Sequence, residues 1–327
     1  MMIESRFTTP DGVDVAVRTA LPQGDPRGIV HVLHGMAEHA RRYDRLAGEL
    51  AAAGYVVVAH DHRGHGHTSP ESLGHLADSG GWSLLVEDAR GLGAAARAEH
   101  PGIPYVLLGH SMGSLVARTL VLDHSEDVDG LVLLGTAADP GALTRLGGLG
   151  LARLLTRVQG PRRPSRIMDR LTFGSFNAPF EGRTRFDWIS ADPDAVDDYV
   201  ADPLCGFVCS NRFFVDLLTG TGEVNDRRRV AGIRPGLPVL LASGDQDPVG
   251  DRGAGVSDTA AAYRRVGLRD VTIRLYPGAR HDLLAGAEHE ELVAELLAWL
   301  DTHVPPTPSS PIAPVIPLRR ERDDTDD

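Results

Sequence analysis

The chain has 327 residues, of which 42% are hydrophobic and 24% charged, a balance typical of a globular protein with one large domain or two small ones. A formal net charge of −12 argues against nucleic-acid binding, which needs a basic surface, and gives no electrostatic attraction to anionic membranes. Residues 1–11 lack a signal-peptide pattern, and no apolar run approaches the ~20 residues that cross a bilayer. The two cysteines, Cys205 and Cys209, are expected as buried thiols. We therefore expect a cytoplasmic protein.

The first predicted elements in chain order form a β-hairpin. Residues 3–8 and 13–19 flank a Pro-Asp-Gly turn at residues 10–12, and valines alternate with polar residues in the second segment. This alternation is typical of a strand with one buried face.

From residue 29 onward, apolar strands alternate with amphipathic helices. The predicted strands cover residues 29–33, 55–59, 105–108, 131–134, 239–242 and 271–276. The segments between most of them carry apolar residues at helical spacing, and a last helix is predicted over residues 292–300. Strands that are nearly all apolar and alternate with helices predict an α/β fold with a mostly parallel sheet covered on both faces.

The alternation is interrupted over residues 137–236, which contain no convincing central strand and only short helical patterns. The simplest organisation is a core made of residues 1–136 and 237–303, with residues 137–236 inserted as a helical cap. Residues 304–327 are dense in proline and then almost entirely charged, so we predict a disordered tail.

The stretch Gly109-His110-Ser111-Met112-Gly113 lies between a predicted strand and a predicted helix. Gly-x-Ser-x-Gly in this position is typical of a tight turn that exposes a nucleophilic serine, here Ser111. A β-carbon on either glycine would collide with the neighbouring backbone. The alternative is an ordinary Gly/Ser loop between two core elements.

A nucleophilic serine needs a base, and the base needs an orienting acid; in this strand-to-helix arrangement they follow the serine in the order acid, then histidine. Asp245 and Asp247 both lie in the loop after the strand at 239–242, and their spacing excludes neither. His281 is the only histidine directly after the last strand. His289 and His303 lie on the final helix or at its end, and we expect them to face solvent.

Acyl transfer also requires two N–H donors for the oxyanion. The Met112 amide, at the start of the helix after the serine, is one candidate. The other is expected after the first parallel strand, in His34-Gly35-Met36, as the Met36 amide.

Four histidines, His60, His62, His65 and His67, crowd into one short stretch. A metal site is one interpretation, but no matching pair of ligands occurs elsewhere at a metal-ligand spacing. The alternative is a loop held together by hydrogen bonds of the imidazoles, Asp61 and Arg63.

Four motifs together resemble the monoacylglycerol lipase/lysophospholipase branch of the α/β-hydrolases. They are residues 34–39 (HGMAEH), 61–66 (DHRGHG), 109–113 (GHSMG) and 276–281 (YPGARH). Between the two candidate acids, the resemblance favours Asp247, which occupies the position of the family's acid before Pro248. The chain departs from the family pattern at Ser114, where a glycine is usual, and at Asp282, where a glutamate is frequent.

The resemblance implies a serine ester hydrolase with the triad Ser111, Asp247 and His281 and with Met36 and Met112 as oxyanion donors. It also implies a single-chain acyl ester as substrate, and the mechanism needs no cofactor and no metal. The rival predictions are a peptidase or amide hydrolase with the same triad, and a non-catalytic binding protein. We expect transient contact of the cap with lipid surfaces and acyl contacts from cap phenylalanines. These are Phe173, Phe176, Phe207 and Phe214.

Overall fold

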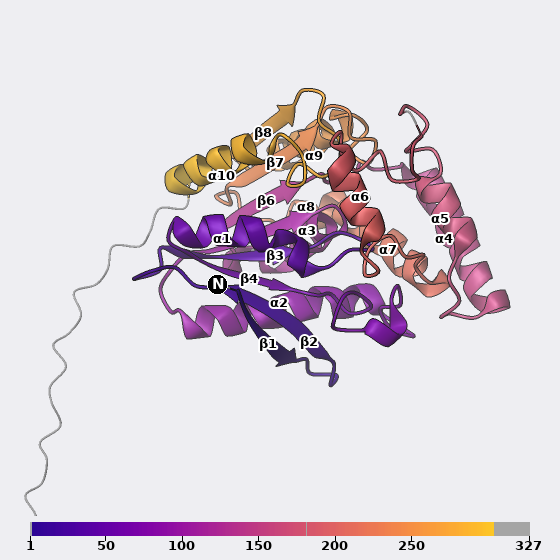
Figure 1. The fold of residues 1–327 in the computed structure, drawn as a ribbon, viewed down its shortest axis with the longest axis horizontal. Helices are drawn as coiled ribbons and strands as arrows, with labels where there is room; N and C mark the ends of the chain where they lie inside the picture. Colours follow the sequence, from indigo (N-terminus) through magenta and orange to yellow (C-terminus); the bar gives the residue numbers. More distant parts are fainter. Residues whose placement is uncertain (1, 181, 304–327) are drawn as a thin grey trace, which may run out of the picture.

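An eight-stranded sheet forms the centre of the computed structural model, which describes residues 2–180 and 182–303 (Figure 1). The strands are β1 (Met2–Thr8), β2 (Asp14–Ala20), β3 (Gly28–Leu33), β4 (Tyr55–His60), β5 (Tyr105–His110), β6 (Gly130–Leu134), β7 (Val239–Gly244) and β8 (Val271–Tyr276). Their order across the sheet is β1-β2-β4-β3-β5-β6-β7-β8. The predicted hairpin forms the antiparallel edge, where β2 pairs with β1 and with β4, and the other strand pairs are parallel.

Helices cover both faces of the sheet, as the apolar strands require. Successive residues of a strand point to opposite faces, so Ile29 of β3 packs in one hydrophobic cluster and Val30 in the other. The cluster of Ile29 includes side chains of α2 (Gly81–Glu99), α3 (Met112–His124) and α9 (Ala254–Arg265). The cluster of Val30 includes side chains of α1 (Asp44–Ala52) and α10 (His289–His303).

Five helices of the described ranges lie between β6 and β7 in the chain. They are α4 (Ala142–Gln159), α5 (Arg166–Phe173), α6 (Pro193–Ala201), α7 (Asn211–Val224) and α8 (Arg227–Val230). The first two of them lie beyond one end of the sheet in Figure 1, whereas the last lies beside α3. The short helical patterns of this segment lie around residues 146–155 and 213–218 and predict α4 and α7, whereas α5, α6 and α8 were not predicted. The missed signal for α6 is Asp192, whose side chain accepts a hydrogen bond from the Asp194 N–H, followed by Pro193 at the first helical position.

Two further predictions concern the ends of the chain and membranes. The disordered tail predicted for residues 304–327 lies outside the described residues. Among the helices of the described ranges, none is both long enough and apolar enough to span a bilayer.

Candidate active site

Ser111 connects β5 to α3 in a strained conformation. Its backbone has φ 52° and ψ −118°, a conformation that residues other than glycine rarely adopt. The Ser111 N–H donates to the Leu134 carbonyl of the neighbouring strand at 2.9 Å. A β-carbon on Gly109 would collide with the backbone of Gly113, and one on Gly113 with the backbone of Leu33. The glycines therefore permit the close approach of chain segments that holds the serine at the end of β5.

Asp247 and His281 form a buried pair beside this turn. His281 Nδ1 lies 3.0 Å from Asp247 Oδ2, and the two side chains are 4% and 0% exposed. The Ser243 hydroxyl and the Val249 N–H donate to the carboxylate at 3.1 and 2.9 Å. The carboxylate is thus fixed by three partners and can hold the imidazole in one orientation.

The neighbouring acid, Asp245, is turned to a different partner. Its Oδ1 accepts from the Gly278 N–H at 2.8 Å and connects the two loops that follow β7 and β8. The side chains two residues apart therefore do not share a site, and the structure places Asp247 rather than Asp245 against His281.

His281 also lies against the serine turn itself. Its ring centroid is 4.9 Å from that of His110, the residue before Ser111. The predicted oxyanion loop, residues 34–36, also lies against Ser111. A β-carbon built on its Gly35 would lie 3.1 Å from the Ser111 β-carbon. The fold therefore brings together the segments that carry the serine, the histidine and the loop with Met36.

The two predicted oxyanion donors, the amides of Met36 and Met112, have no hydrogen-bond acceptor within residues 2–180 and 182–303. Met112 is the first residue of α3, where backbone N–H groups have no helical partner. Met36 follows Gly35 in a loop that includes Ala37 at φ 54°. Two unpaired donors near one serine match the requirement of a developing oxyanion.

Glu38 is buried between this loop and the serine turn. It accepts hydrogen bonds from the Gly35 N–H, the Tyr43 hydroxyl at 2.7 Å and Arg42 Nε at 3.0 Å, and it lies 3.3 Å from His110 Nδ1. Burial would raise the pKa of Glu38, but the hydrogen bond from His110 and the charges of His110 and Arg42 hold it well below its ordinary value. Burial would lower the pKa of His110, but Glu38 outweighs this and raises it. A carboxylate and an imidazole whose pKa values are shifted in opposite directions are thus buried together next to Ser111.

The sequence model of a protein family described as "serine aminopeptidase, S33" matches residues 24–288. The chain belongs to this family. It is 31% identical over 301 residues to a monoacylglycerol lipase of Mycolicibacterium smegmatis, covering 92% of this chain and 98% of the relative. It is 29% identical over 289 residues to the human monoglyceride lipase, covering 86% and 82%. The crystal structure of a thermostable carboxyl esterase from Bacillus coagulans with glycerol superposes with a TM-score of 0.85 at 29% identity, covering 93% and 99%.

In this S33-family chain, aromatic side chains of the inserted segment, at the end of α5 and in the loop before α6, lie over the histidine. The Trp188 ring centroid is 5.2 Å from that of His281, and Phe173 and Phe176 contact Trp188 at 6.0 and 5.3 Å. Trp188 was missed because a lone aromatic residue in a segment without periodicity carries no signal. The prediction that Phe214 contacts an acyl chain is wrong, because Phe214 is 1% exposed and packs in the core beside the sheet.

The inserted segment is also hydrogen-bonded to the oxyanion loop. The Ala37 carbonyl accepts from the Tyr199 hydroxyl and from the Gly206 N–H, both at 2.9 Å. His39 Nε2 lies 2.8 Å from Asp202 Oδ2. With the thiol of Cys205, these two side chains place three potential metal ligands within 4.8 Å of one another. The Arg42 guanidinium lies next to that thiol and opposes a cation there, so we interpret the group as a tether between loop and insertion.

The histidines of residues 60–67 are buried, except for His67, which is exposed. His60 and His62 hydrogen-bond to each other at 3.1 Å, and Asp61 accepts from the Ala40 and His67 N–H groups at 2.8 and 2.7 Å. These contacts agree with the hydrogen-bonded-loop interpretation. The prediction that His289 faces solvent is wrong, because its ring is buried and its Nε2 lies 2.7 Å from Glu49 Oε2 of α1.

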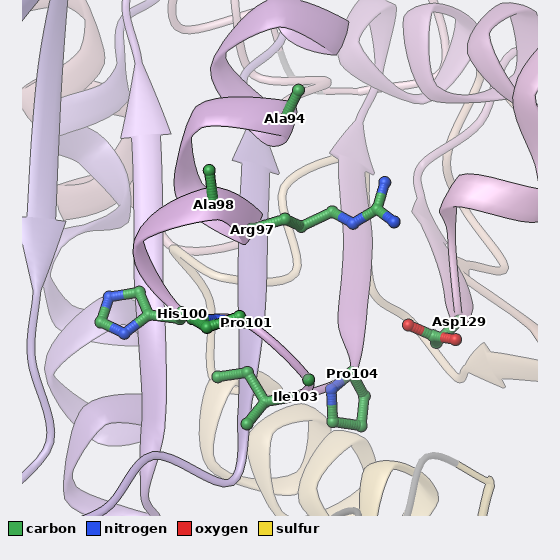
Figure 2. A pocket seen from close by; sticks show the side chains of 9 residues that line it. Ala94, Arg97, Ala98, His100, Pro101, Ile103, Pro104 and Asp129 are labelled. Atoms are coloured by element: carbon green, nitrogen blue, oxygen red, sulfur yellow. The ribbon is translucent and has the colours of Figure 1, made fainter.

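A surface pocket of about 580 Å³ lies elsewhere in the fold (Figure 2). Arg97, His100, Pro104 and Asp129 line it, at the end of α2 and directly before β5. Ser111 follows β5, so the whole length of the strand, about 20 Å, separates pocket and serine. Sites in parallel sheets lie beyond the carboxyl ends of the strands, and this pocket lies at the opposite end.

Proposed function

We propose that the protein is a serine hydrolase of carboxylic esters with a single acyl chain, of the monoacylglycerol type. The observation that carries the proposal is the buried pair of His281 Nδ1 and Asp247 Oδ2 at 3.0 Å beside the strained Ser111. The relatives named above, a monoacylglycerol lipase and a monoglyceride lipase, support the substrate class.

In the proposed reaction, Ser111 Oγ attacks the ester carbonyl carbon while His281 Nε2 takes its proton. The oxyanion that forms is held by the Met36 and Met112 N–H groups. Collapse expels the alcohol, which receives the proton from His281 and leaves an acyl-enzyme. A water molecule then attacks the acyl carbon with His281 again as base, the carboxylic acid leaves, and Ser111 recovers its proton. Asp247 holds His281 in the productive tautomer and stabilises its charged form.

A fluorophosphonate probe tests this proposal, since it labels an activated serine. We expect the probe to label the wild type and Ser257→Ala, which changes an exposed serine on α9, and to leave Ser111→Ala unlabelled. A panel of monoacylglycerols, lysophospholipids, p-nitrophenyl esters and aminoacyl amides then measures kcat/KM. Faster turnover of the amides than of the esters would favour the peptidase, and an unlabelled wild type would favour a binding protein.

We further propose that residues 137–236 act as a cap whose outer face touches anionic lipid surfaces. Helices α4 and α5 leave a set of apolar side chains between 48% and 87% exposed, and this set is here named the apolar face. Its members are Leu143, Leu146, Leu154 and Val158 of α4 and Ile167 and Leu171 of α5. Residues 142–170 contain seven arginines and one aspartate, so this region is basic although the whole chain carries −12.

Exposed apolar residues next to arginines favour the surface of an anionic membrane, where each arginine contributes about 1 kcal/mol. Cosedimentation with vesicles of phosphatidylcholine, with and without phosphatidylglycerol, measures the contact. We expect binding to the anionic vesicles that weakens with salt and is reduced in a Leu143→Ser/Leu146→Ser variant. Leu21→Ser changes an exposed leucine outside the apolar face and should bind as the wild type does. Equal binding by all three proteins would refute the proposed contact.

The two cysteines bear on the compartment. Cys205 and Cys209 are both buried and form no disulfide, and we retain the cytoplasm as the proposed location because unpaired thiols persist there. Cell fractionation with an antibody to the chain tests this location.

A further inference from the structure

A continuous chain of buried hydrogen bonds runs through the sheet to the oxyanion loop. The Tyr105 hydroxyl lies 2.7 Å from His31 Nδ1. His31 Nε2 lies 3.1 Å from His60 Nδ1, and His60 Nε2 lies 3.1 Å from His62 Nδ1. His62 Nε2 ends the chain at 3.1 Å from the His34 carbonyl oxygen. The three imidazoles of the chain are fully buried, so water cannot replace any of these partners.

The last acceptor in this series of hydrogen bonds, the His34 carbonyl oxygen, determines where each proton lies. A carbonyl oxygen only accepts, so His62 must carry its proton on Nε2 and leave Nδ1 as an acceptor. His60 must then donate from Nε2, and His31 from Nε2 in turn. His31 Nδ1 is left as the acceptor of the Tyr105 hydroxyl. One arrangement of neutral tautomers satisfies every group, and an additional proton on any ring would place two donors face to face.

The imidazole of His34 contacts this series of hydrogen bonds and also hydrogen-bonds to the oxyanion loop. His34 Nε2 accepts the His62 backbone N–H at 2.9 Å, so the His34 proton lies on Nδ1. His34 Nδ1 donates it to the Gly35 carbonyl at 2.7 Å. The Gly35 N–H in turn donates to the Glu38 carboxylate.

These contacts determine the direction of the Met36 N–H. The carbonyl of the Gly35–Met36 peptide is held by His34, and the preceding peptide is held at its carbonyl by His62 and at its N–H by Glu38. A trans peptide directs its N–H opposite to its carbonyl. Of the polar groups of the two peptides, the Met36 N–H is therefore the one that has no partner among residues 2–180 and 182–303.

We propose that His31, His60 and His62 are positioning residues that hold the oxyanion loop through a chain of fixed tautomers ending at the His34 carbonyl. The inference rests on the proposed function, in which the Met36 N–H stabilises the oxyanion. In the other tautomer His62 would present a bare Nε2 to the carbonyl oxygen, so two acceptors would repel each other and release the loop.

Histidine tautomers test the chain without reference to activity. In protein labelled with ¹⁵N-histidine, two-bond ¹H–¹⁵N correlation spectra distinguish the tautomers, and single histidine variants assign the signals. We expect protonated Nε2 for His31, His60 and His62 and protonated Nδ1 for His34. Any one of the four in the opposite tautomer, or a charged ring among them at pH 7, would overturn the proposal.

Paired variants test the link to catalysis. The amide nitrogen of Gln occupies nearly the place of Nε2, so His62→Gln can still donate to the His34 carbonyl, whereas His62→Leu cannot. We expect His62→Leu to lose kcat about 10- to 100-fold on p-nitrophenyl butyrate with KM nearly unchanged, below the 10²–10³ of a fully lost oxyanion donor. His62→Gln should recover most of this loss.

His65→Leu is the matched control. His65 is buried in the same cluster, but its Nε2 has no hydrogen-bond partner among the described residues, so kcat should stay within about twofold of the wild type. Equal losses in His62→Gln and His62→Leu, or wild-type kcat in both, would overturn the positioning role. If the His62 variants do not fold, the tautomers of the wild type still decide. A wild type that fluorophosphonate does not label would instead refute the proposed function and leave the tautomer result standing.

Discussion

Acidification should unfold this protein at a mildly acidic pH, because five imidazoles are buried in their neutral form. Burial, with repulsion between neighbouring imidazoles, places the pKa values of His31, His34 and His62 well below the ordinary value. Burial lowers the pKa of His60 to about 3 and that of His65 to about 4. In the unfolded chain each of them regains a pKa near 6.5.

The direction of the change in stability with pH depends on which state, folded or unfolded, binds more protons. Because the unfolded chain takes up protons that the folded chain refuses, the full stability is present above pH 6.5 and declines as the pH falls toward the lower folded values. One pH unit below 6.5 costs about 1.4 kcal/mol for each imidazole. Five imidazoles therefore cost up to about 7 kcal/mol at pH 5.5, which is comparable to the whole stability of a typical domain.

Urea unfolding followed by circular dichroism at pH 8.0, 6.5, 6.0 and 5.5 measures this decline. His31→Phe should reduce the loss between pH 8.0 and 5.5 by about one fifth, since one of five such groups is removed. His67→Gln changes an exposed imidazole and serves as the control. A stability that changes by less than about 2 kcal/mol over this interval would refute the assignment of five neutral buried imidazoles.

Three more predictions concern the candidate site. Asp247→Asn should lower kcat by up to ~10⁴-fold because the amide can favour the wrong tautomer of the histidine, and Asp245→Asn should cost far less; the reverse order in steady-state assays would show that the acid is misassigned. Trp188→Ala should lower the free energy of unfolding by about 3–5 kcal/mol, as for other buried aromatic side chains. Chemical denaturation measures this loss, and Trp188→Phe, which keeps an aromatic ring, is the comparison. Equal stability of the two variants would contradict the packing argument. Glu38→Gln should lower the pKa of His110, since the largest contribution that opposes burial is then removed. The stability from His110, present below pH 6.5 and lost as the pH rises through the raised value, should decrease with it. An unchanged NMR titration of His110 would contradict the pairing.

The order of elements and the serine turn could be predicted from the sequence, because both depend on local patterns. Apolar runs alternate with helical periodicity, and this is sufficient for a parallel sheet with helices on both faces. Gly109 and Gly113 flank Ser111 at the end of such a run, so the turn follows from the steric needs of three neighbouring residues. The position of His281 after the last strand also follows from chain order alone.

Tertiary structure alone decided which residues meet across the site. Asp245 and Asp247 are equivalent in spacing, and only the fold turns one toward His281 and the other toward Gly278. Trp188 reaches the histidine from a segment without periodicity. Such contacts depend on backbone directions that are set by packing many residues away, which local patterns do not encode.

The histidines show the same limit. Sequence spacing groups His60, His62, His65 and His67 as neighbours, yet the hydrogen-bonded chain omits two of them and instead includes His31 and Tyr105 from adjacent strands. Strand register places His60 and Tyr105 two positions from the residues opposite His31, on the same face of the sheet. The sequence by itself therefore determined the fold class and the site's chemical groups, while register and packing decided their partners, because hydrogen bonds depend on distances that only the folded chain defines.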